Sequence, residues 1–239
     1  MNIALIGYGK MGHEIENIAL QRGHKIVAII DLTTNDTFDS PAFRSANVAI
    51  EFTRPDAVVA NLHRCFEEGI PVVCGTTGWA EQLPVIRQEM EATNGTLFWS
   101  SNFSLGVNLF FALNRHLAKL MNPFSDYNVR MVEVHHTQKL DAPSGTAITL
   151  AEIILKELDR KSIWVKEAEQ QANQLAITSI REGNVPGIHE VIYESEMDSI
   201  SIKHDAKSRR GFALGAVLAA EFSHNKKGFL GMNDLLAIF

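Results

Sequence analysis

The sequence has few cysteines, no long apolar run and no excess of positive charge, and each absence excludes a class of protein. Its two cysteines, Cys65 and Cys74, make neither a disulfide framework nor a zinc-ligand set. They fall in segments predicted to be a helix and a buried strand, so we expect reduced structural thiols, as is usual in the cytoplasm. No apolar run reaches the roughly 18 to 20 residues that cross a bilayer, which argues against a membrane partner.

The charge of the chain also limits its partners. The formal net charge is -6 and the pI is near 5.8, whereas nucleic-acid phosphates attract a positive field. The opening MNIALIG lacks the basic region and the cleavable apolar stretch of a secretion signal. With 46% apolar residues, the 239-residue chain can form a real core. We therefore expect a soluble, globular, cytoplasmic protein that binds no nucleic acid.

The N-terminal segment has the pattern of a dinucleotide-binding fold. A short apolar run, 3–6, leads into a G-x-G-x-x-G motif and then a helical pattern. Gly7 permits the tight turn, Gly9 lets the backbone approach a pyrophosphate, and Gly12 lets the helix pack closely on the strand. A second apolar run ends at Asp31, 19 residues after Gly12, where an acidic residue binds ribose hydroxyls. The alternative is a tight turn with Asp31 capping a loop.

Strand and helix patterns then alternate. Apolar runs at 47–53, 71–79 and 96–104 are separated by amphipathic segments at 55–69 and 80–95. This alternation predicts a parallel sheet wrapped on both faces, with ligands at the carboxyl ends of the strands. Cofactor contacts are therefore expected in the loops that follow the strands, where the segments 52–55, 75–78 and 100–104 should point into one crevice. Those predicted on the nicotinamide side are Gly75, Thr76 and Thr77, for which a simple polar turn is the alternative.

The second half has a different pattern. After an amphipathic helix at 102–121, alternating strand patterns are interrupted by one helix at 144–160, and the segment 210–239 returns to helix. We expect the strands at 127–136, 174–183, 189–197 and 198–207. The fold class is thus α/β, a Rossmann-like parallel sheet domain plus a largely antiparallel α+β domain with a mixed open sheet. The boundaries are expected near residues 104 and 209, and the Lys- and Gln-rich stretch 161–171 is expected to be a solvated connection.

The stretch EVHHTQKLDAPSGTA, residues 133–147, concentrates proton carriers beside a small turn. His135 and His136 end a strand, so their side chains should diverge. Histidine carries a proton near neutral pH, and Lys139 can attract an anion or deliver a proton. Behind Pro143, a helix begins with free N–H groups that suit a carboxylate, at Ser144, Gly145 and Thr146. The segment indicates a small anionic substrate that is protonated during reaction.

Each residue of this stretch also has a purely structural interpretation. Ser144 can be only a helix cap, Lys139 only a solvated charge, and a histidine only a hydrogen-bonded strand end. Paired histidines also suggest a metal, but zinc needs three or four ligands at suitable spacing. No nearby cysteine or H-x-x-x-H arrangement supplies them, so no metal is expected.

These motifs together resemble the dihydrodipicolinate reductase (4-hydroxy-tetrahydrodipicolinate reductase) family of lysine and diaminopimelate biosynthesis. The resemblance spans almost the whole chain in the same order, through GYGKMG, EFTRP, GTTG, NFSLGVN, HHTQKLDAPSGTA and GAVLAAEF. The string HHTQKLDAPSGTA is its most specific part. Membership implies a dinucleotide-binding domain at 1–104 and 209–239, and a substrate-binding and oligomerisation domain at 105–208 that builds a homotetramer.

The resemblance also implies an activity and residue roles. The activity is NADH- or NADPH-dependent reduction of 4-hydroxy-tetrahydrodipicolinate, a small dicarboxylate, to tetrahydrodipicolinate with loss of water. His135 would be the proton donor or acceptor and Lys139 a second donor. His136 would touch the substrate, and Gly145 with Thr146 would hold a substrate carboxylate. The implied cofactor contacts are Gly7, Tyr8, Gly9, Lys10, Met11, Gly12, Asp31, Gly75, Thr76, Thr77, Ser100, Ser101, Asn102 and Phe103.

Two features depart from the family pattern. The common loop has the form G-x-x-G-x-M-G, whereas GYGKMG is shorter, which could shift the pyrophosphate without abolishing its site. Asp31 favours the free ribose of NADH, but no arginine follows it and Lys10 lies where a cation could meet an extra phosphate. The choice between NADH and NADPH therefore stays open.

Two other functions are compatible with parts of the sequence. A two-domain amino-acid dehydrogenase of the diaminopimelate or aspartate type would share the N-terminal half, but it would have no reason to carry HHTQKLDAPSGTA. A sensor that binds a dinucleotide and docks a partner would bind the cofactor tightly and turn nothing over. Turnover with a dicarboxylate substrate separates the three.

Overall fold

A computed structural model describes residues 1–166, 171–208 and 210–237 of the chain. The chain divides into two compact units, Met1–Leu105 with Arg209–Phe239, and Gly106–Ser208. No helix in the described ranges has the length and apolar character needed to span a membrane.

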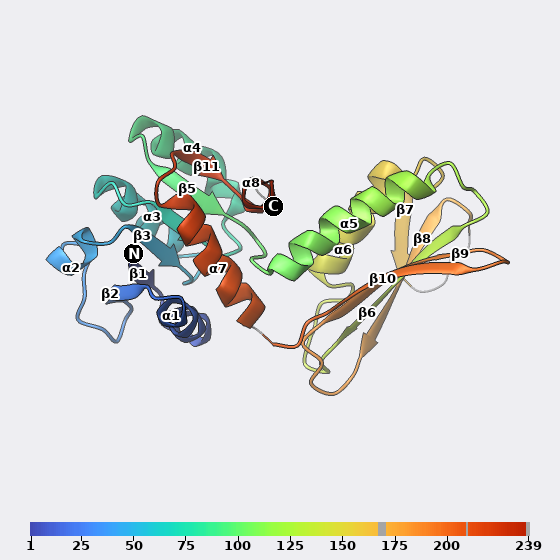
Figure 1. Ribbon diagram of the computed structural model, residues 1–239, viewed down its shortest axis with the longest axis horizontal. Coiled ribbons are helices and arrows are strands. Elements are labelled where there is room, and N and C mark those ends of the chain that lie inside the picture. The colour runs from blue at the N-terminus through green and yellow to red at the C-terminus, as the bar shows by residue number, and fades with distance from the viewer. Residues whose placement is uncertain (167–170, 209, 238–239) are drawn as a thin grey trace. The chain divides into compact units, whose positions relative to one another are not determined.

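The first unit is built on a six-stranded parallel sheet (Figure 1). Its helices, in chain order, are α1 (Lys10–Gln21), α2 (Pro41–Arg44), α3 (Val58–Glu67), η1 (Ala80–Gln82), α4 (Leu83–Ala92), α7 (Arg210–Ser223) and α8 (Met232–Leu236). The strands, in sheet order, are β11 (Gly228–Leu230), β5 (Thr96–Trp99), β4 (Val72–Cys74), β3 (Val48–Glu51), β1 (Asn2–Ile6) and β2 (Lys25–Ile30).

Both faces of this sheet are covered, as the strand alternation requires. On β1, Ile3 and Leu5 pack against α1, α7 and α8, while Ala4 and Ile6 pack against α3 and its neighbours. Cys65 and Cys74 are buried and free in the second of these cores. The predicted Rossmann-like parallel sheet is confirmed.

Helix α7 lies beside α1 and packs closely on the chain that leaves β5 (Figure 1). A Cβ at Gly215 would lie 1.7 Å from the carbonyl oxygen of Phe103, so only glycine permits this approach. The close contact fixes Phe103, one of the predicted cofactor contacts.

The prediction of helix throughout 210–239 was wrong for residues 228–230, which form β11. This short strand lies at the sheet edge beside β5. Gly228 has φ +96°, a left-handed conformation that an α-helix does not contain, so helix cannot continue through it. A helical pattern in a short segment with glycines was therefore misleading.

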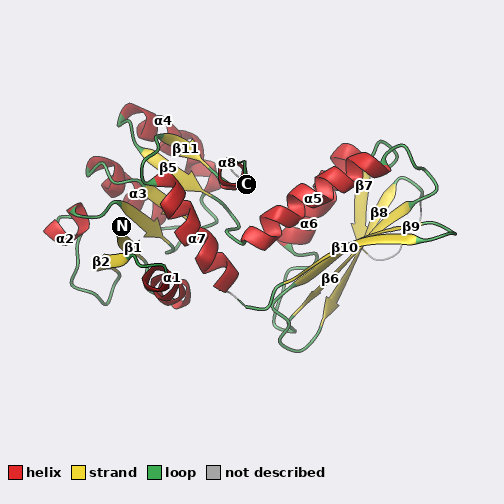
Figure 2. Ribbon diagram, in the orientation of Figure 1, coloured by secondary structure: helices red, strands yellow, loops and turns green. Residues whose placement is uncertain are grey.

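The second unit is an open five-stranded sheet with two helices (Figure 2). The strands, in sheet order, are β10 (Ser199–Asp205), β9 (Ile188–Glu194), β6 (Asn128–His135), β8 (Gln174–Arg181) and β7 (Ile163–Lys166). In Figure 2, α5 (Leu105–Met121) and α6 (Gly145–Glu157) lie together on one side of these strands. They share a core with the inward residues of the sheet, including Val129, Met131 and Tyr193.

The sheet is mixed, as predicted, but it is less antiparallel than expected. Strand β9 is antiparallel to both β10 and β6, whereas β8 is parallel to both β6 and β7. The expectation of a solvated connection over 161–171 was wrong for 163–166, which form β7, with Trp164 and Val165 half-buried. Pairing with β8 gives the backbone of β7 hydrogen bonds along one side, which stabilises the strand despite its polar neighbours. Residues 167–170 lie outside the described residues.

Candidate active site

The glycine motif of the first unit forms a turn that leaves no room for a side chain at Gly7 and Gly12, whereas the space beside Gly9 is open. Gly7 has φ +92°, and a Cβ there would lie 2.2 Å from the carbonyl oxygen of Phe52. A Cβ at Gly12 would lie 2.5 Å from the carbonyl oxygen of Gly7. Gly9 caps α1 without any side-chain hydrogen bond, so the first N–H groups of the helix stay available to an anion. These features fit the pyrophosphate of a dinucleotide.

Asp31 follows β2 and is held beside the glycine turn. Its carboxylate accepts a hydrogen bond from the N–H of Tyr8 at 2.7 Å. Asp31, Gly7 and Gly9 line one cavity, together with Leu32 and Arg54. A carboxylate fixed beside the pyrophosphate turn is positioned as a ribose ligand requires.

Two further cavities of this unit gather most of the other predicted cofactor residues. One is lined by Gly9, Lys10, Met11, Gly75, Thr76 and Thr77, and the other by Met11, Gly75, Ser101, Asn102 and Phe103. Tyr8, Gly12 and Ser100 line none of these three cavities. The Tyr8 hydroxyl bonds Glu16, and the Ser100 hydroxyl bonds the backbone of Asn102.

The segment 52–55 was expected at the ligand crevice because it follows β3, although no single residue of it was given a contact. Its first residue, Phe52, lines all three cavities. A Cβ at Gly75 would lie 2.1 Å from the Phe52 ring, so Gly75 makes room for that ring. Buried Thr76 accepts the N–H of Thr53 at 2.8 Å and so joins the two loops.

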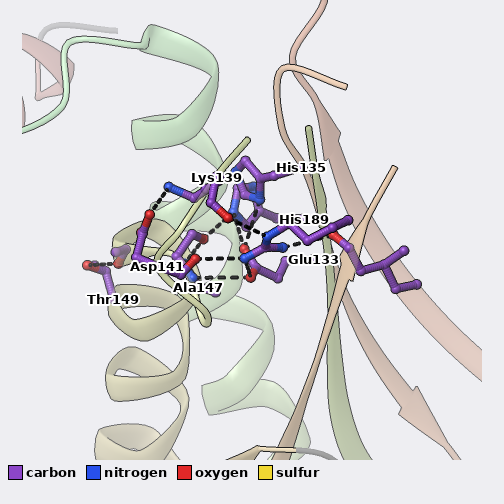
Figure 3. Close-up of polar contacts among 11 residues, drawn as sticks. Glu133, His135, Lys139, Asp141, Ala147, Thr149 and His189 are labelled. Atoms are coloured by element: carbon purple, nitrogen blue, oxygen red, sulfur yellow. Dashed lines mark hydrogen bonds and ion pairs between the residues drawn. The ribbon is translucent and has the colours of Figure 1, made fainter. Parts of the chain in front are cut away.

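In the second unit, β6 and β9 bring together a buried carboxylate and two imidazoles (Figure 3). His135 Nδ1 lies 2.9 Å from Glu133 Oε2, with both side chains nearly inaccessible at 8% and 1% exposed. His189, opposite Glu133 in the antiparallel pair, lies 3.9 Å from the same oxygen through its Nε2. The two imidazole rings meet edge-on, with centroids 5.1 Å apart.

The other carboxylate oxygen, Glu133 Oε1, accepts hydrogen bonds from two directions. The Ser144 N–H donates to it at 3.2 Å, and Arg181 Nη2 donates at 3.1 Å. Burial by itself would raise the pKa of Glu133, but hydrogen bonds from His135, Ser144, Ser179 and Arg181 outweigh it and hold that pKa well below its usual range. Glu133 is therefore a buried carboxylate that stays ionised.

Arg181 also ties the loop that carries Lys139 to this carboxylate. Its guanidinium donates to the carbonyl oxygens of Asp141 at 2.7 Å and Lys139 at 3.4 Å. Lys139 Nζ lies 2.8 Å from Asp141 Oδ1 and lowers the pKa of that carboxyl (Figure 3). Lys139 thus sits on a loop held in place by its backbone, with its ammonium paired near the surface.

Helix α6 begins directly behind the loop. Ser144 caps it, with its hydroxyl accepting the N–H of Ala147 at 3.2 Å and contacting His189 Nε2 at 3.0 Å. Gly145 is exposed and Thr146 half-buried, and within the described ranges no protein acceptor contacts their N–H groups. The expectation of a free N–H at Ser144 was wrong, because that N–H donates to Glu133, but the N–H groups of Gly145 and Thr146 can still bind a carboxylate. His136 is half-buried and does not join the histidine cluster.

Sequence reasoning missed Glu133, Arg181 and His189 as site residues. Glu133 carried a signal, because residues two apart on a strand share a face, so it lies on the same side as His135. His189 and Arg181 depend on strand register, which places His189 opposite Glu133 and Arg181 opposite His135. Local patterns do not contain that register.

Glu133, His135 and His189 offer ligand atoms within 4.8 Å of one another. Their contacts differ from those of a metal site, because Glu133 Oε1 already accepts two donors and His135 Nδ1 is at hydrogen-bond distance from Oε2. The arrangement fits a network of hydrogen bonds and an ion pair, and the expectation of no metal stays a prediction.

A parallel sheet with a dinucleotide-binding turn, joined to a mixed-sheet unit with a buried carboxylate and imidazoles, defines the class of two-domain α/β dehydrogenases. Family models agree with it over nearly the whole chain. "Dihydrodipicolinate reductase, N-terminus" matches residues 1–103, and "Dihydrodipicolinate reductase, C-terminus" matches residues 106–236.

Individual relatives give the same result. The chain is 47% identical over 239 residues to a 4-hydroxy-tetrahydrodipicolinate reductase of Christiangramia forsetii, covering 99% of this chain and 98% of the relative. It is 33% identical to one of Ralstonia nicotianae, with 100% of each chain covered. A dipicolinate-bound dihydrodipicolinate reductase of a Paenisporosarcina species shares its fold, with a TM-score of 0.75, 22% identity and 97% of each chain covered. The chain belongs to the dihydrodipicolinate reductase family.

The environment of His189 predicts a pH-dependent stability. Burial, and then the nearby His135, lower the pKa of His189 from 6.5 to about 4. As pH falls from 7 to 5, His189 therefore binds a proton in the unfolded chain but not in the folded protein, and the free energy of unfolding decreases. In denaturant titrations, the decrease in the free energy of unfolding from pH 7 to pH 5 should be smaller by about 2 kcal/mol in His189→Gln than in the wild type. The exposed-histidine control His116→Gln should keep all of it; equal decreases in the three proteins would contradict the assignment.

Proposed function

We propose that this protein reduces 4-hydroxy-tetrahydrodipicolinate to tetrahydrodipicolinate, with loss of water, in lysine and diaminopimelate biosynthesis. The observation that carries the proposal is 47% identity, over almost the full length of both chains, to a protein named for this reaction. The site chemistry supports it: an imidazole backed by a buried carboxylate lies in the same unit as a lysine-bearing loop and a free helix start.

The division of labour follows the two units. Residues 1–104 and 209–239 bind the dinucleotide, through the glycine turn and the loops after the strands. The bound reduced nicotinamide supplies a hydride. Residues 105–208 bind the substrate, with Gly145 and Thr146 donating N–H groups to a carboxylate and His136 touching the ring. Because both ligands take part in one transfer, they are bound at the same time.

His135 and Lys139 are the proton donors of the proposed reaction. As the hydride arrives, negative charge grows on the conjugated ring system, and an acid positioned beside it lowers the barrier. His135 donates this proton, and Lys139 contributes a cation and a second donor. The pairing of Lys139 with Asp141 holds its ammonium on the loop that leads into α6.

Turnover tests this function directly. The product of the preceding synthase, made fresh, should be reduced in the presence of NADH or NADPH, with loss of absorbance at the nicotinamide band. His135→Gln and Lys139→Met should each lower kcat by about 10²- to 10⁴-fold, the usual contribution of a positioned acid. Lys156→Met, which removes an exposed lysine of the same unit, should not.

Two outcomes would contradict the proposal. Oxidation of meso-diaminopimelate without reduction of the synthase product would indicate an amino-acid dehydrogenase. Tight cofactor binding without turnover of either dicarboxylate would indicate a sensor.

We propose that NADH is the preferred cofactor. The Asp31 carboxylate lines the cavity beside the glycine turn, where it would repel a ribose phosphate. The residue after it, Leu32, carries no charge to offset that repulsion. Arg54 lines the same cavity but is paired with Asp56 at 3.3 Å.

Exchanging the carboxylate for a hydroxyl tests this preference. Asp31→Ser should raise the NADPH-to-NADH ratio of kcat/KM by roughly 10-fold or more, because a like-charge contact near the surface is worth at least about 1.4 kcal/mol. Asp39→Ser removes the same charge at a site 75% exposed and should leave the ratio unchanged. An unchanged ratio in Asp31→Ser would mean that this carboxylate does not face the ribose.

We also propose a homotetramer, formed through the face of the five-stranded sheet opposite α5 and α6, as family resemblance suggests. On that face the strands present apolar side chains that are only partly buried, among them Val132, Val134, Ile180, Ile188 and Ile192. Such a face is stabilised by a partner.

We propose a cytoplasmic location. The reaction needs a supply of reduced nicotinamide, and the two buried free thiols are typical of a reducing compartment.

Sedimentation velocity tests the assembly. The wild-type protein should sediment as a tetramer, and Thr178→Arg, in the middle of this face, should sediment as a smaller species because it buries an unpaired charge. Val85→Arg, on exposed α4, is the control and should leave the tetramer intact. A wild-type monomer would end this part of the proposal.

A further inference from the structure

We infer that Glu133 is a positioning residue, which holds His135 with its Nδ1 proton directed into the protein and leaves Nε2 as the nitrogen that exchanges a proton with substrate. The inference rests on the proposed function, because His135 is the proton donor there. It adds a residue that no sequence motif selected and a specific tautomer of the imidazole.

The geometry begins with one strand. Glu133 and His135 lie two residues apart on β6, so both side chains leave the same face of the sheet. His135 Nδ1 and Glu133 Oε2 are both fully buried and lie 2.9 Å apart, and within the described residues neither atom is hydrogen-bonded to any other group. The backbone of His135 is also held, since its carbonyl accepts the N–H of Glu182 at 2.8 Å. The ring therefore has one buried nitrogen with a carboxylate beside it.

Glu133 can hold the ring because its own orientation is locked. Oε1 accepts the Ser144 N–H and Arg181 Nη2, so the carboxylate has donors on one oxygen and His135 on the other. The low pKa of Glu133 means that Oε2 acts as an acceptor throughout the neutral range. An acceptor facing Nδ1 selects the form in which Nδ1 carries a proton.

The groups that surround this pair preserve the arrangement. From β9, His189 faces Glu133 Oε2 at 3.9 Å, and with its pKa lowered to about 4 by burial it is neutral and does not replace His135 as the ion-pair partner. Its Nε2 contacts the Ser144 hydroxyl instead. The other charged or titratable groups nearby are Arg181 at the end of β8, Lys139 and Asp141 on the loop after β6, and His204 on β10.

The second nitrogen of His135 lies beside a glycine. A Cβ at Gly187 would come within 3.0 Å of His135 Nε2, so the absence of a side chain there keeps space next to this nitrogen. The two nitrogens thus have different environments, and the ring cannot exchange them without losing Glu133.

This arrangement defines the proton step. After hydride transfer, the electron pair of the substrate's conjugated system takes the proton of His135 Nε2, so a C–H bond forms as the Nε2–H bond breaks. The imidazolium becomes a neutral imidazole whose remaining proton is on Nδ1, facing Glu133. Solvent returns a proton to Nε2 before the next turnover. Glu133 stays ionised and never touches the substrate.

The substitution Glu133→Gln reverses the tautomer while keeping the shape. The Ser144 N–H and Arg181 both need an acceptor, so the amide oxygen occupies the place of Oε1. The amide NH₂ then faces His135 Nδ1, which becomes the acceptor, and the neutral ring carries its proton on Nε2. Losing that proton would leave an imidazolate, so donation fails.

Kinetics and binding measure the consequence. In Glu133→Gln, kcat should fall by about 10²- to 10⁴-fold, the contribution of a general acid. KM and the Kd for dipicolinate, used as a non-reacting dicarboxylate probe, should stay within threefold. Glu133→Asp retains a carboxylate, and its kcat should be at least tenfold higher than that of Glu133→Gln. Glu196→Gln, which removes an exposed carboxylate of the same unit outside the site, should behave as wild type.

The ¹⁵N spectrum of selectively labelled histidine gives a readout that a purely structural role would not change. At a pH where the ring is neutral, His135, assigned by its loss in His135→Gln, should show a protonated Nδ1 in the wild type and a protonated Nε2 in Glu133→Gln. A wild-type ring protonated only on Nε2, or a Glu133→Gln variant with kcat within threefold of wild type, would overturn the inference.

The outcomes separate this inference from the proposed function. If the wild-type protein does not reduce the substrate, the proposed function fails, while the tautomer of His135 still reports on Glu133. If Glu133→Gln does not fold, the wild-type spectrum and the kcat of Glu133→Asp decide the inference by themselves. A kcat of Glu133→Asp below 1% of wild type, together with an Nε2 proton in the wild type, would reject it.

Discussion

The candidate site depends on one buried carboxylate that is kept ionised. Removing a carboxylate from water is costly, and Glu133 offsets that cost with donors from an arginine, a backbone N–H and an imidazole. Each donor belongs to a different part of the site: the end of β8, the start of α6 and the end of β6. Satisfying one charge therefore fixes the relative positions of the His135 imidazole, the helix start and the lysine loop.

The first unit depends on glycines, whose lack of a side chain allows close packing, rather than on a buried charge. Gly7, Gly12 and Gly75 each lie where a Cβ would meet backbone or the Phe52 ring, so the turn and the neighbouring loop close tightly around the cavities. Asp31, held by the Tyr8 N–H, adds a carboxylate beside this turn, and we propose that it selects between the two ribose forms. The first unit is thus shaped for a dinucleotide by close backbone approach, whereas the second is arranged around a buried charge.

Much of this was predictable from the sequence, and the misses have a common physical cause. Alternating apolar runs predict the parallel sheet, and motif spacing locates Asp31, because both are local properties of the chain. Strands β7 and β11 escaped prediction since each is short and stabilised by pairing with a distant strand. His189 and Arg181 enter the site through the register of β9 and β8 against β6, which short-range patterns do not contain. Glu133 was within reach, because a two-residue spacing from His135 already puts both on one face.

A crystal structure of the protein with NADH and dipicolinate would test the central claim most directly. We predict a dicarboxylate with one carboxylate at the N–H groups of Gly145 and Thr146, its ring facing His135 Nε2, and Nδ1 still against Glu133. A dicarboxylate bound away from the start of α6, or a His135 ring turned so that Nε2 faces Glu133, would contradict it.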